Sequence, residues 1–373
     1  MSKIRVLTVF GTRPEAIKMA PLVKELEKHP EVFKSIVCVT AQHRQMLDQV
    51  LNLFDIKPDF DLNIMKPNQD LWKITSDVLL LMKEVFEECN PDIVLVHGDT
   101  TTSMAAALSA FYARIPVGHV EAGLRTFDKH YPFPEEINRV FADAVCTYHF
   151  APTETSVENL IKSAIPDTHI YKTGNTVIDA LLHTVKNNKA DLSYIGLDPD
   201  LKTILLTSHR RENFGEPIRN ICKAVLELVE KNKDIQVVYP VHLNPNVQKP
   251  VKELLEGKER IHLIDPMEYA PFSTLMKESH LIMTDSGGVQ EEAPSLGKPV
   301  LVLRSTTERP EAVEYGTVKL VGTDKDKIVE EVQKLLDDKE AYKKMSESVN
   351  PYGDGLASQR IVKIIQKEFH IVN

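Results

Sequence analysis

The sequence predicts an α/β fold made of two Rossmann-like, doubly wound domains with a cleft between them. Short apolar runs alternate with amphipathic stretches from end to end, which is typical of parallel sheets with helices on both faces. A chain of 373 residues, 42% of them hydrophobic, is too long for one typical core and favours two domains. The polar stretch at 186–200 precedes a new apolar run, so we expect a second sheet to begin there.

The apolar runs predict strands, and the stretches between them predict helices. The expected strands are Val6–Phe10, Ser35–Thr40, Ile93–His97, Val117–Val120, Thr203–Thr207, Gln236–Pro240, Ile261–Ile264, His280–Met283 and Val300–Leu303. The helices that the amphipathic patterns predict include Ala16–Lys28, Gln45–Phe54, Leu71–Cys89, Ser103–Ala113 and Ile218–Lys231.

Composition excludes several classes of protein. The net charge of −9 and the absence of a dense Lys/Arg block argue against a general nucleic-acid surface. The N-terminus leads directly into a strand without a signal peptide's apolar region, and no apolar run approaches 18 residues, so we expect neither secretion nor a membrane span. We therefore expect a cytoplasmic protein with reduced, structural cysteines at Cys38, Cys89, Cys146 and Cys222.

Ligands of open α/β sheets bind beyond the carboxyl ends of the strands, and the most informative stretch lies at such a position. Asp285–Gly288 follows the apolar run Leu281–Met283 and opens a helical segment. Glycines let the backbone approach a phosphate, and the amides of a helix start point toward it. Glu292, further along, could reach the hydroxyls of a ribose. An ordinary glycine turn capped by Ser286 explains the local pattern equally well.

The first half places charged groups after three predicted strands. Gly11–Glu15 follows the first strand, with Arg13 and Lys18 suited to a phosphate. Asp99 follows Ile93–His97, where it could equally cap the next helix. Glu121 ends an apolar strand, where a carboxylate needs a partner or a purpose, and Arg125 could be that partner.

A further acidic pair follows Pro134 at the expected start of a helix. The helix dipole is a sufficient structural reason for one of Glu135 and Glu136. Carboxylates from three separate elements can nevertheless converge at the mouth of one cleft. Such convergence separates their pKa values and provides an acid and a base together.

The second half contributes cationic groups at corresponding positions. His209 follows the strand Thr203–Thr207 and precedes two arginines, whereas His242 follows Gln236–Pro240 with weaker neighbours. Arg309 stands near another helix start. Cationic and glycine loops for a diphosphate, an acid for a ribose and carboxylates on the facing domain together predict a nucleotide-sugar site. A P-loop, a GxGxxG fingerprint and metal-ligand spacings are missing from the sequence, so we expect no cofactor and no metal.

Taken together, the motifs resemble the non-hydrolysing UDP-N-acetylglucosamine 2-epimerases. The resemblance runs in order along nearly the whole chain, through Gly11–Glu15, His97–Thr101, His119–Arg125, Pro134–Glu136, His209–Asn213, Thr284–Pro294, Glu308–Glu311 and Asn350–Gly355. The family has the GT-B architecture, in which the last helix, here roughly Ser358–Glu368, returns to the first domain. The resemblance thus implies a first domain of 1–172 joined by 357–373, and a UDP-binding domain of 173–356.

The family interconverts UDP-GlcNAc and UDP-ManNAc in the cytoplasm, commonly as a homodimer, for cell-surface polysaccharides. Its members eliminate UDP to give 2-acetamidoglucal and then add it back, which needs a base, an acid and stabilisation of the leaving diphosphate. By resemblance the acid–base set is Asp99, Glu121 and Glu135, and His209 stabilises the diphosphate. The resemblance implies further substrate contacts at Arg13, Lys18, Phe272, Ser286, Gly287, Gly288, Glu292 and Arg309.

Bacterial members can also require UDP-GlcNAc at a regulatory site beside the catalytic one. The residues that fit this pattern are Gln42, Gln45, Gln69, Arg210 and His242. Asn68 stands where some such members carry an arginine, so the sequence leaves open how much of the activation is retained.

Three other functions remain open from the sequence. A hydrolysing 2-epimerase of the same fold would release ManNAc and UDP, and differs in how well it excludes water. A GT-B glycosyltransferase would use the same donor site but needs an acceptor groove, and fewer clustered acids. A nucleotide-sugar sensor would bind without turnover.

Overall fold

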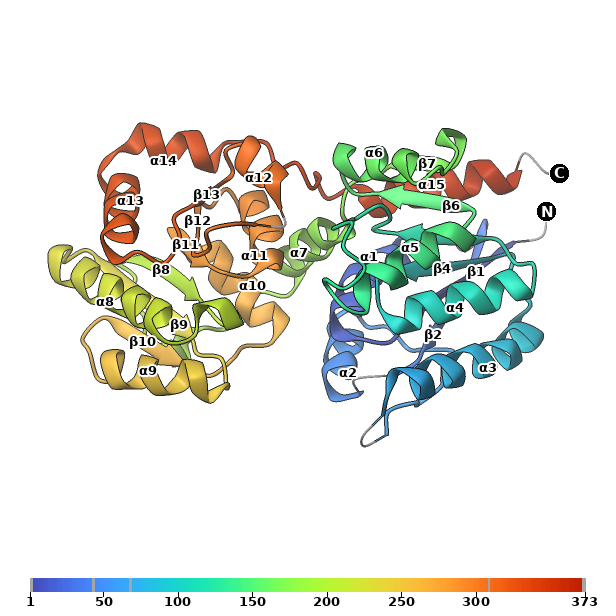
Figure 1. Cartoon of the computed structure of the whole chain (residues 1–373), viewed down its shortest axis with the longest axis horizontal. Coiled ribbons are helices and arrows are strands. Elements are labelled where there is room, and N and C mark those ends of the chain that lie inside the picture. Colours follow the sequence, from blue (N-terminus) through green and yellow to red (C-terminus); the bar gives the residue numbers. More distant parts are fainter. Residues whose placement is uncertain (1–2, 42–43, 67–68, 308, 371–373) are drawn as a thin grey trace. The chain divides into compact units, whose positions relative to one another are not determined.

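The chain folds into two compact units, each with its own parallel sheet and core (Figure 1). The computed structural model describes residues 3–41, 44–66, 69–307 and 309–370. The first unit comprises residues 1–180 and 352–373, and the second comprises residues 181–351. Each unit is described by itself below.

The first unit is built on a sheet that has the order β3-β2-β1-β4-β5-β6-β7 in the described part of the chain. All of its paired strands run parallel. The central strands are buried throughout, which explains why they read as continuous apolar runs. The strands are β1 (Ile4–Phe10), β2 (Phe33–Val39), β3 (Phe60–Asp61), β4 (Ile93–His97), β5 (Val117–Val120), β6 (Tyr148–Ala151) and β7 (Ile170–Lys172).

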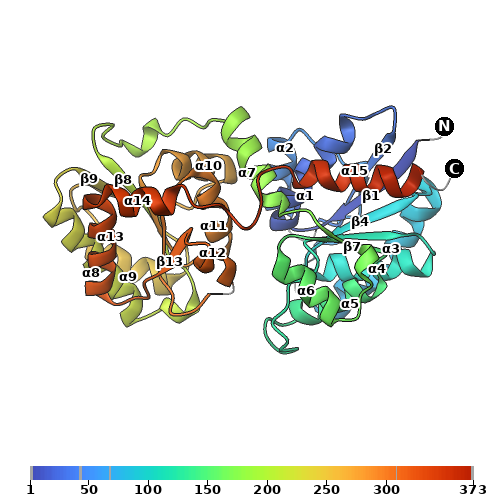
Figure 2. The same ribbon diagram turned by 90° about the horizontal axis from the view of Figure 1, so that it is seen from above.

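Helices cover this sheet and include the C-terminal helix of the chain. Val78 and Met82 on α3 pack with Ala106 on α4 against β1, β2 and β4 in one buried cluster. Helix α15 returns to this unit and packs beside α1 (Figure 2). The helices are α1 (Arg13–Glu27), α2 (Arg44–Leu53), α3 (Leu71–Cys89), α4 (Thr101–Tyr112), α5 (Glu135–Val145), α6 (Glu154–Lys162), the 3₁₀ helix η1 (Asp167–His169), the start of α7 (Thr176–Asn187) and α15 (Ala357–His370).

The second unit repeats the plan with the strand order β10-β9-β8-β11-β12-β13 among the described residues. Its strands are also paired in parallel. They are β8 (Lys202–Thr207), β9 (Ile235–Pro240), β10 (Ile261–Ile264), β11 (Leu281–Thr284), β12 (Val300–Val302) and β13 (Val318–Leu320).

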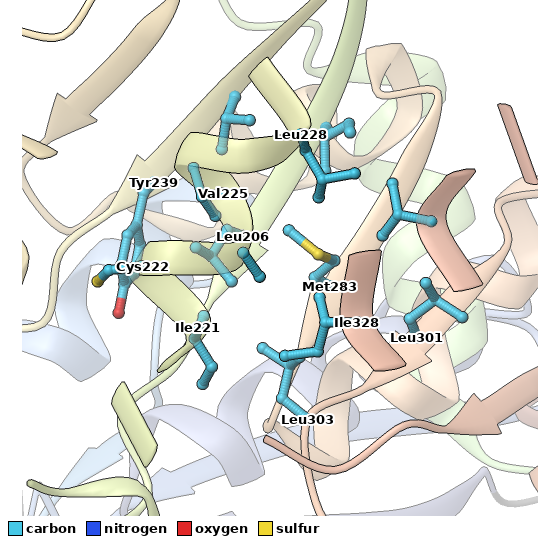
Figure 3. Close-up of a cluster of buried hydrophobic side chains, with 14 of the residues drawn as sticks. Leu206, Ile221, Cys222, Val225, Leu228, Tyr239, Met283, Leu301, Leu303 and Ile328 are labelled. Carbon is cyan, nitrogen blue, oxygen red and sulfur yellow. The ribbon is translucent and has the colours of Figure 1, made fainter. Parts of the chain in front are cut away.

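The core of the second unit lies between this sheet and helices α8 and α13. Figure 3 shows Val225 and Leu228 of α8 and Ile328 of α13 gathered around Leu206 and Met283 of the sheet. All five side chains are fully buried. The helices are η2 (Ser193–Ile195), η3 (Arg211–Asn213), α8 (Glu216–Lys231), α9 (Pro245–Leu255), α10 (Tyr269–Glu278), α11 (Gly287–Glu292), η4 (Ala293–Leu296), α12 (Pro310–Glu314), α13 (Lys325–Asp337) and α14 (Lys339–Ser346).

The predicted α/β class and its strand–helix alternation are confirmed. All the predicted strands and the helices named from the sequence occur, with small differences at their ends. The prediction omitted β3, β6, β7 and β13, which lie toward the sheet edges. These strands are short, and polar residues such as Lys319 interrupt the apolar run by which a buried strand is recognised.

The domain bounds of 1–172 and 173–356 remain a prediction, although the change of unit lies close to them. The first change falls between Ala180 and Leu181, inside the continuous helix α7. No composition shift marks a boundary within a helix. The polar stretch at 186–200 does precede β8, as expected.

No helix in the part of the chain that the structure describes is long and apolar enough to span a bilayer.

Candidate active site

Each sheet has one point where its strand order reverses, and most of the predicted site residues follow strands at or next to it. In the first unit this point lies between β1 and β4, and in the second between β8 and β11. The connections that leave two such strands diverge, which opens a crevice at the carboxyl edge of the sheet. The topology therefore places the first-unit acids and the second-unit glycine turn at the edges where α/β proteins bind ligands.

Glu121 is a largely enclosed carboxylate with polar groups from three parts of the chain around it. It pairs with Lys18 of α1, and its Oε2 accepts a hydrogen bond of 2.9 Å from Nδ2 of Asn175. Nε2 of His97, at the end of β4, lies 3.7 Å from the same oxygen. Glu121 also has a left-handed backbone with φ of 63°. A non-glycine residue keeps that conformation only where its surroundings determine it.

These contacts decide the ionisation of Glu121. Burial alone raises the pKa of the Glu121 carboxyl, but the nearby Lys18 and His97 lower it by more than burial raises it. The net result is a pKa well below the usual range for glutamate. Glu121 is therefore a carboxylate at neutral pH, although it is almost completely enclosed.

Asp99 and the start of α5 are joined by a second ion pair. Arg139 of α5 pairs with Asp99, and its Nη1 lies 3.3 Å from Oε2 of Glu136. Nδ2 of Asn138 donates to the backbone oxygen of Asp99 at 3.0 Å. The β4–α4 connection and α5 are thereby fixed to each other, and Glu135 begins α5 at the same place.

The structure separates the roles of the two adjacent acids. Glu136 is buried and accepts hydrogen bonds from the backbone amides of Thr126 and Phe127. Glu136 therefore stabilises the loop that precedes α5. Glu135 is half-buried at the first position of the helix, which leaves it as the candidate for chemistry.

Arg125 is not the partner of Glu121, and that suggestion from the sequence is wrong. Its Nη2 lies 2.6 Å from Oδ2 of Asp143 on α5, and the partner of Glu121 is Lys18. The sequence after β5 does not indicate that Arg125 pairs with Asp143, because only the folded chain brings these two residues together.

The buried ring of His119 also contacts this pair. Nδ1 of His119 lies 2.5 Å from Oδ1 of Asp143, and Nε2 lies 2.7 Å from the backbone oxygen of Gly98. Both ring nitrogens face acceptors, an arrangement that favours the doubly protonated ring. Burial lowers the pKa of His119, but Asp143 raises it by more, and the result lies above the ordinary value. Conversely, burial raises the pKa of Asp143, while His119 and Arg125 lower it below its ordinary value.

Glu15 is a further buried acid whose role the sequence analysis did not assign. Its Oε2 accepts from the amides of Gly11 and Thr12, at 3.1 and 2.8 Å. Its Oε1 accepts from the hydroxyls of Thr100 and Ser103, at 2.7 and 3.0 Å. The connections after β1 and β4 are thus tied together, which places Arg13 and Asp99 on one framework. The Thr12-x-x-Glu15 capping box was the available signal.

In the second unit, Asp285 organises the connection that follows β8. The side chain is fully buried, and its Oδ2 accepts from Ser208 Oγ at 2.9 Å and Asn213 Nδ2 at 2.9 Å. The same oxygen accepts from the backbone amides of His209 and Arg210, at 2.8 and 2.9 Å. An acid directly after an apolar strand was the criterion that singled out Glu121, and the same signal applied to Asp285.

His209 lies over this buried acid. Its Nδ1 is 3.4 Å from Oδ1 of Asp285, and its ring stacks on that of His242 with centroids 5.6 Å apart. Burial has the largest effect and lowers the pKa of His209; Asp285 raises it, Arg210 and His242 lower it, and the net pKa lies below the ordinary value for histidine. The ring is therefore predominantly neutral near pH 7 and has capacity to gain a proton when an anion approaches.

Two guanidinium groups flank the glycine turn after β11. A Cβ atom on Gly287 would lie 3.7 Å from Nη2 of Arg210 and 3.9 Å from Nη2 of Arg309. Gly288 next to it is exposed, and Ser286 is the N-cap of α11. Arg309 is also paired with Glu291, which fixes its position. Two cations at a turn with accessible backbone form an arrangement suited to a phosphorylated ligand.

The remaining second-unit candidates lie on α10 and α11. Glu292 is buried, and its Oε1 accepts a hydrogen bond of 2.6 Å from the hydroxyl of Tyr269. A Cβ atom on Gly288 would lie 3.9 Å from the other oxygen of Glu292, so this acid and the turn are neighbours. Phe272, three residues after Tyr269, is half-buried. Tyr269 was not anticipated, because a tyrosine in an amphipathic helix gives no signal.

The residues predicted for regulation are divided between the two units. Arg210 and His242 both neighbour His209 in the second unit. In the first unit, Gln45 is exposed on α2, and the side chain of Gln69 donates to the backbone oxygen of Ile64. Gln42 and Asn68 lie outside the described residues.

Within the described ranges, no cluster of three or more His, Cys, Asp or Glu side chains is placed to hold a metal ion.

Comparison with known proteins agrees with this arrangement along the whole chain. The family model described as UDP-N-acetylglucosamine 2-epimerase matches residues 24–366. The UDP-N-acetylglucosamine 2-epimerase of Escherichia coli K12 is 58% identical over 371 residues, which cover 97% of this chain and 98% of that protein.

Two solved structures carry a bound nucleotide sugar. The Neisseria meningitidis UDP-GlcNAc 2-epimerase bound to UDP-GlcNAc is 54% identical, with a TM-score of 0.87 over 98% of this chain and 100% of that one. The Methanocaldococcus jannaschii enzyme in complex with UDP-GlcNAc and UDP is 35% identical, with a TM-score of 0.77 over the same shares.

The two Rossmann-like units and their similarity to these structures define a protein of the GT-B architecture. The chain belongs to the UDP-N-acetylglucosamine 2-epimerase family.

We predict that Asp143→Ala destabilises the first unit by about 3–5 kcal/mol, because it leaves His119 and Arg125 as buried, unmatched cations. The loss should be largest between about pH 4 and 6.5, the unfolded pKa values of Asp and His. The lowered pKa of Asp143 stabilises the folded state above about pH 4, and the raised pKa of His119 stabilises it below about pH 6.5.

Urea unfolding followed by circular dichroism across this pH range measures the effect. Glu158→Ala, which breaks an exposed ion pair with Lys162 in the same unit, is the control and should change the free energy of unfolding by less than about 0.5 kcal/mol. Equal effects of the two substitutions would show that Asp143 is not needed to balance the buried cations.

Proposed function

We propose that the protein catalyses the reversible epimerisation of UDP-GlcNAc to UDP-ManNAc at C2. Family membership and the UDP-GlcNAc bound to two relatives support this substrate. The observation that carries the proposal is the pair of acids at the carboxyl edge of the first sheet. Glu121 is held ionised, and a Cβ atom on Gly98, the neighbour of Asp99, would lie 3.6 Å from Oε1 of Glu121.

The reaction begins with elimination, because the C2 proton of the sugar is not adjacent to a carbonyl group. A carboxylate accepts the C2 proton, the electrons of the C–H bond form the C1=C2 double bond, and the C1–O bond breaks toward the diphosphate. The products of this step are 2-acetamidoglucal and UDP. Return of a proton to the other face of C2, with addition of UDP to C1, gives the epimer.

The first unit supplies the proton transfers in this proposal. Glu121 is ionised at neutral pH and largely enclosed, so it is available to accept the C2 proton. Asp99 and Glu135 complete the acid–base set, and Arg139 fixes Asp99. Reversibility requires that groups which lose a proton in one direction accept it in the other, so the carboxylates exchange roles with direction.

The second unit supplies the binding of UDP and the stabilisation of the leaving group. The diphosphate is surrounded by Arg309, Ser286, Gly287 and Gly288. His209 becomes protonated beside the negative charge that develops on the diphosphate. Glu292 is proposed to accept from the ribose, and Phe272 to contact the uracil. Arg13 and Lys18 are the further substrate-binding residues, and Lys18 already neutralises Glu121.

Two alternatives share these residues. A hydrolysing enzyme would let water attack the intermediate, and a glycosyltransferase would direct an acceptor to C1. The clustered acids of the first unit, which handle a C2 proton and not an acceptor hydroxyl, favour epimerisation. We also propose that the protein acts in the cytoplasm as a homodimer. The exposed Phe111 and Tyr112 at the end of α4 provide an apolar surface for such an interface.

Proton NMR of the protein with UDP-GlcNAc in deuterated water tests the reaction. We expect UDP-ManNAc to appear, with deuterium entering C2 of both sugars. Glu121→Gln, which keeps the shape but cannot accept the proton, should reduce turnover at least 100-fold, the scale of a general base. Free ManNAc with UDP would show a hydrolysing enzyme instead, and binding without any change in the spectrum would contradict catalysis.

Arg309→Ala should weaken UDP binding by about 10- to 100-fold, because a hydrogen bond to a charged group contributes about 1.5–3 kcal/mol. Isothermal titration calorimetry with UDP measures this directly. Arg219→Ala is the matched control, since Arg219 lies in the same unit and pairs with Glu253 on the surface. Unchanged affinity in Arg309→Ala would remove the guanidinium from the diphosphate site.

We further propose that UDP-GlcNAc activates the enzyme from a second site that includes Gln42, Gln45, Gln69, Arg210 and His242. The arrangement of Arg210 and His242 around His209 supports a link between this site and the leaving group. With pure UDP-ManNAc we expect a lag in product formation that trace UDP-GlcNAc abolishes. A rate curve that is hyperbolic and unaffected by the trace would contradict activation.

A further inference from the structure

The two places where the chain passes between its units are held together within the first unit. The chain leaves this unit inside α7 and returns to it at Tyr352. Just before α7, the amide of Asn175 donates to the backbone oxygen of Tyr352 at 2.7 Å. Gly174 has φ of 91°, and a Cβ atom there would lie 3.4 Å from the same oxygen. The two segments therefore pack backbone against backbone.

Side chains from both segments reinforce this contact. Asp179 of α7 accepts from the amides of Ala357 and Ser358, at 3.2 and 2.8 Å, and so caps the start of α15. Arg360 of α15 donates to the backbone oxygen of Thr173 at 3.1 Å. Outgoing and returning segments consequently form one hydrogen-bonded structure, which we call the crossing clamp: residues 173–179 and 352–360.

One side chain extends from the crossing clamp to the candidate active site. Asn175 is buried, and its Oδ1 accepts from the amide of Val177 at 3.0 Å. That bond fixes the orientation of the side-chain amide, because the oxygen must face the helix start. The NH₂ group is then directed to Oε2 of Glu121, 2.9 Å away.

We propose that Asn175 is a positioning residue for the reaction: it fixes the Glu121 carboxylate to the crossing clamp and favours its ionised form. The inference rests on the proposed role of Glu121 as an acid–base group. Backbone hydrogen bonds fix both the main chain and the side-chain oxygen of Asn175. Asn175 therefore restricts the orientation of the Glu121 carboxylate more than a flexible lysine does. A protonated Glu121 would be a poorer acceptor, so the contact stabilises the charged state.

The other groups that face Glu121 set the background for this effect. Lys18 approaches from α1 and His97 from the end of β4, and both lower the pKa of Glu121 once burial has raised it. Loss of the Asn175 donor removes one stabilising contact and leaves these two. The pKa of Glu121 in the variant should therefore rise without returning to its unperturbed value.

The test uses Asn175→Ser in the full-length protein. Serine can still cap α7, since it is a preferred N-cap residue, but its shorter side chain cannot reach Glu121. We expect kcat for UDP-GlcNAc to fall about 10-fold or more with little change in KM. The acid limb of the pH profile of kcat/KM should move up by about one pH unit, the scale of one hydrogen bond to a charged group.

Asn175→Asp provides a second measurement, because it also retains the cap and replaces the donor by a second carboxylate. It should move the acid limb further in the same direction. Asp324→Ser is the matched control, because Asp324 caps α13 through the amide of Lys327 in the other unit and has no contact with Glu121. The control should leave the pH profile unchanged, whatever its effect on melting temperature.

The outcomes separate the inference from the function on which it rests. If Glu121→Gln is inactive while Asn175→Ser keeps the wild-type pH profile and kcat, the positioning role is wrong and the proposed function stands. If Glu121→Gln retains full turnover, the proposed role of Glu121 itself fails. A reduced kcat in Asn175→Ser with an unshifted pH profile would show a structural effect only and would also overturn the inference.

Discussion

The structure of the first unit depends on keeping a largely enclosed carboxylate charged. Burial of an isolated carboxylate is unfavourable by several kcal/mol, and such a group normally takes up a proton. Glu121 avoids this because Lys18, His97 and Asn175 each supply positive charge or a donor. These three side chains come from α1, the end of β4 and the start of α7. Their positions explain why those elements must meet at one edge of the sheet.

The second unit solves the same problem in a different way. Asp285 is fully buried, but two of its donors are backbone amides and the others are the neutral side chains of Ser208 and Asn213. Neutral donors stabilise a carboxylate without cancelling its charge. Asp285 can therefore both shape the connection after β8 and attract a proton to His209 above it. The cations of this unit, Arg210 and Arg309, are left to face the glycine turn.

Sequence patterns predicted the fold class, the central strands and the edge of each sheet at which site residues lie. They succeeded because strands buried on both faces are continuous apolar runs, and because residues after such runs must lie at the carboxyl edge. Several strands toward the sheet edges were missed, since half-exposed strands such as β13 lack that run. The predicted acids could be named, but their partners could not. Arg125 follows Glu121 by four residues and pairs with Asp143, whereas Lys18 is far away in sequence.

There is a physical reason why the sequence identifies the acids but not the side chains that pair with them. Which residues a connection contains is a local property, whereas the pKa of a buried acid depends on side chains that only the assembled fold brings near. A base and an acid for one reaction require carboxylates in unlike surroundings. Glu121 is enclosed by the Lys18 ammonium, the ring of His97 and the amide of Asn175, while Glu135 is half-exposed at a helix start. The proposed reversible elimination, which shares protons among such groups, would therefore rely on the tertiary contacts made by Lys18, Asn175 and Arg139, more than on the acids alone.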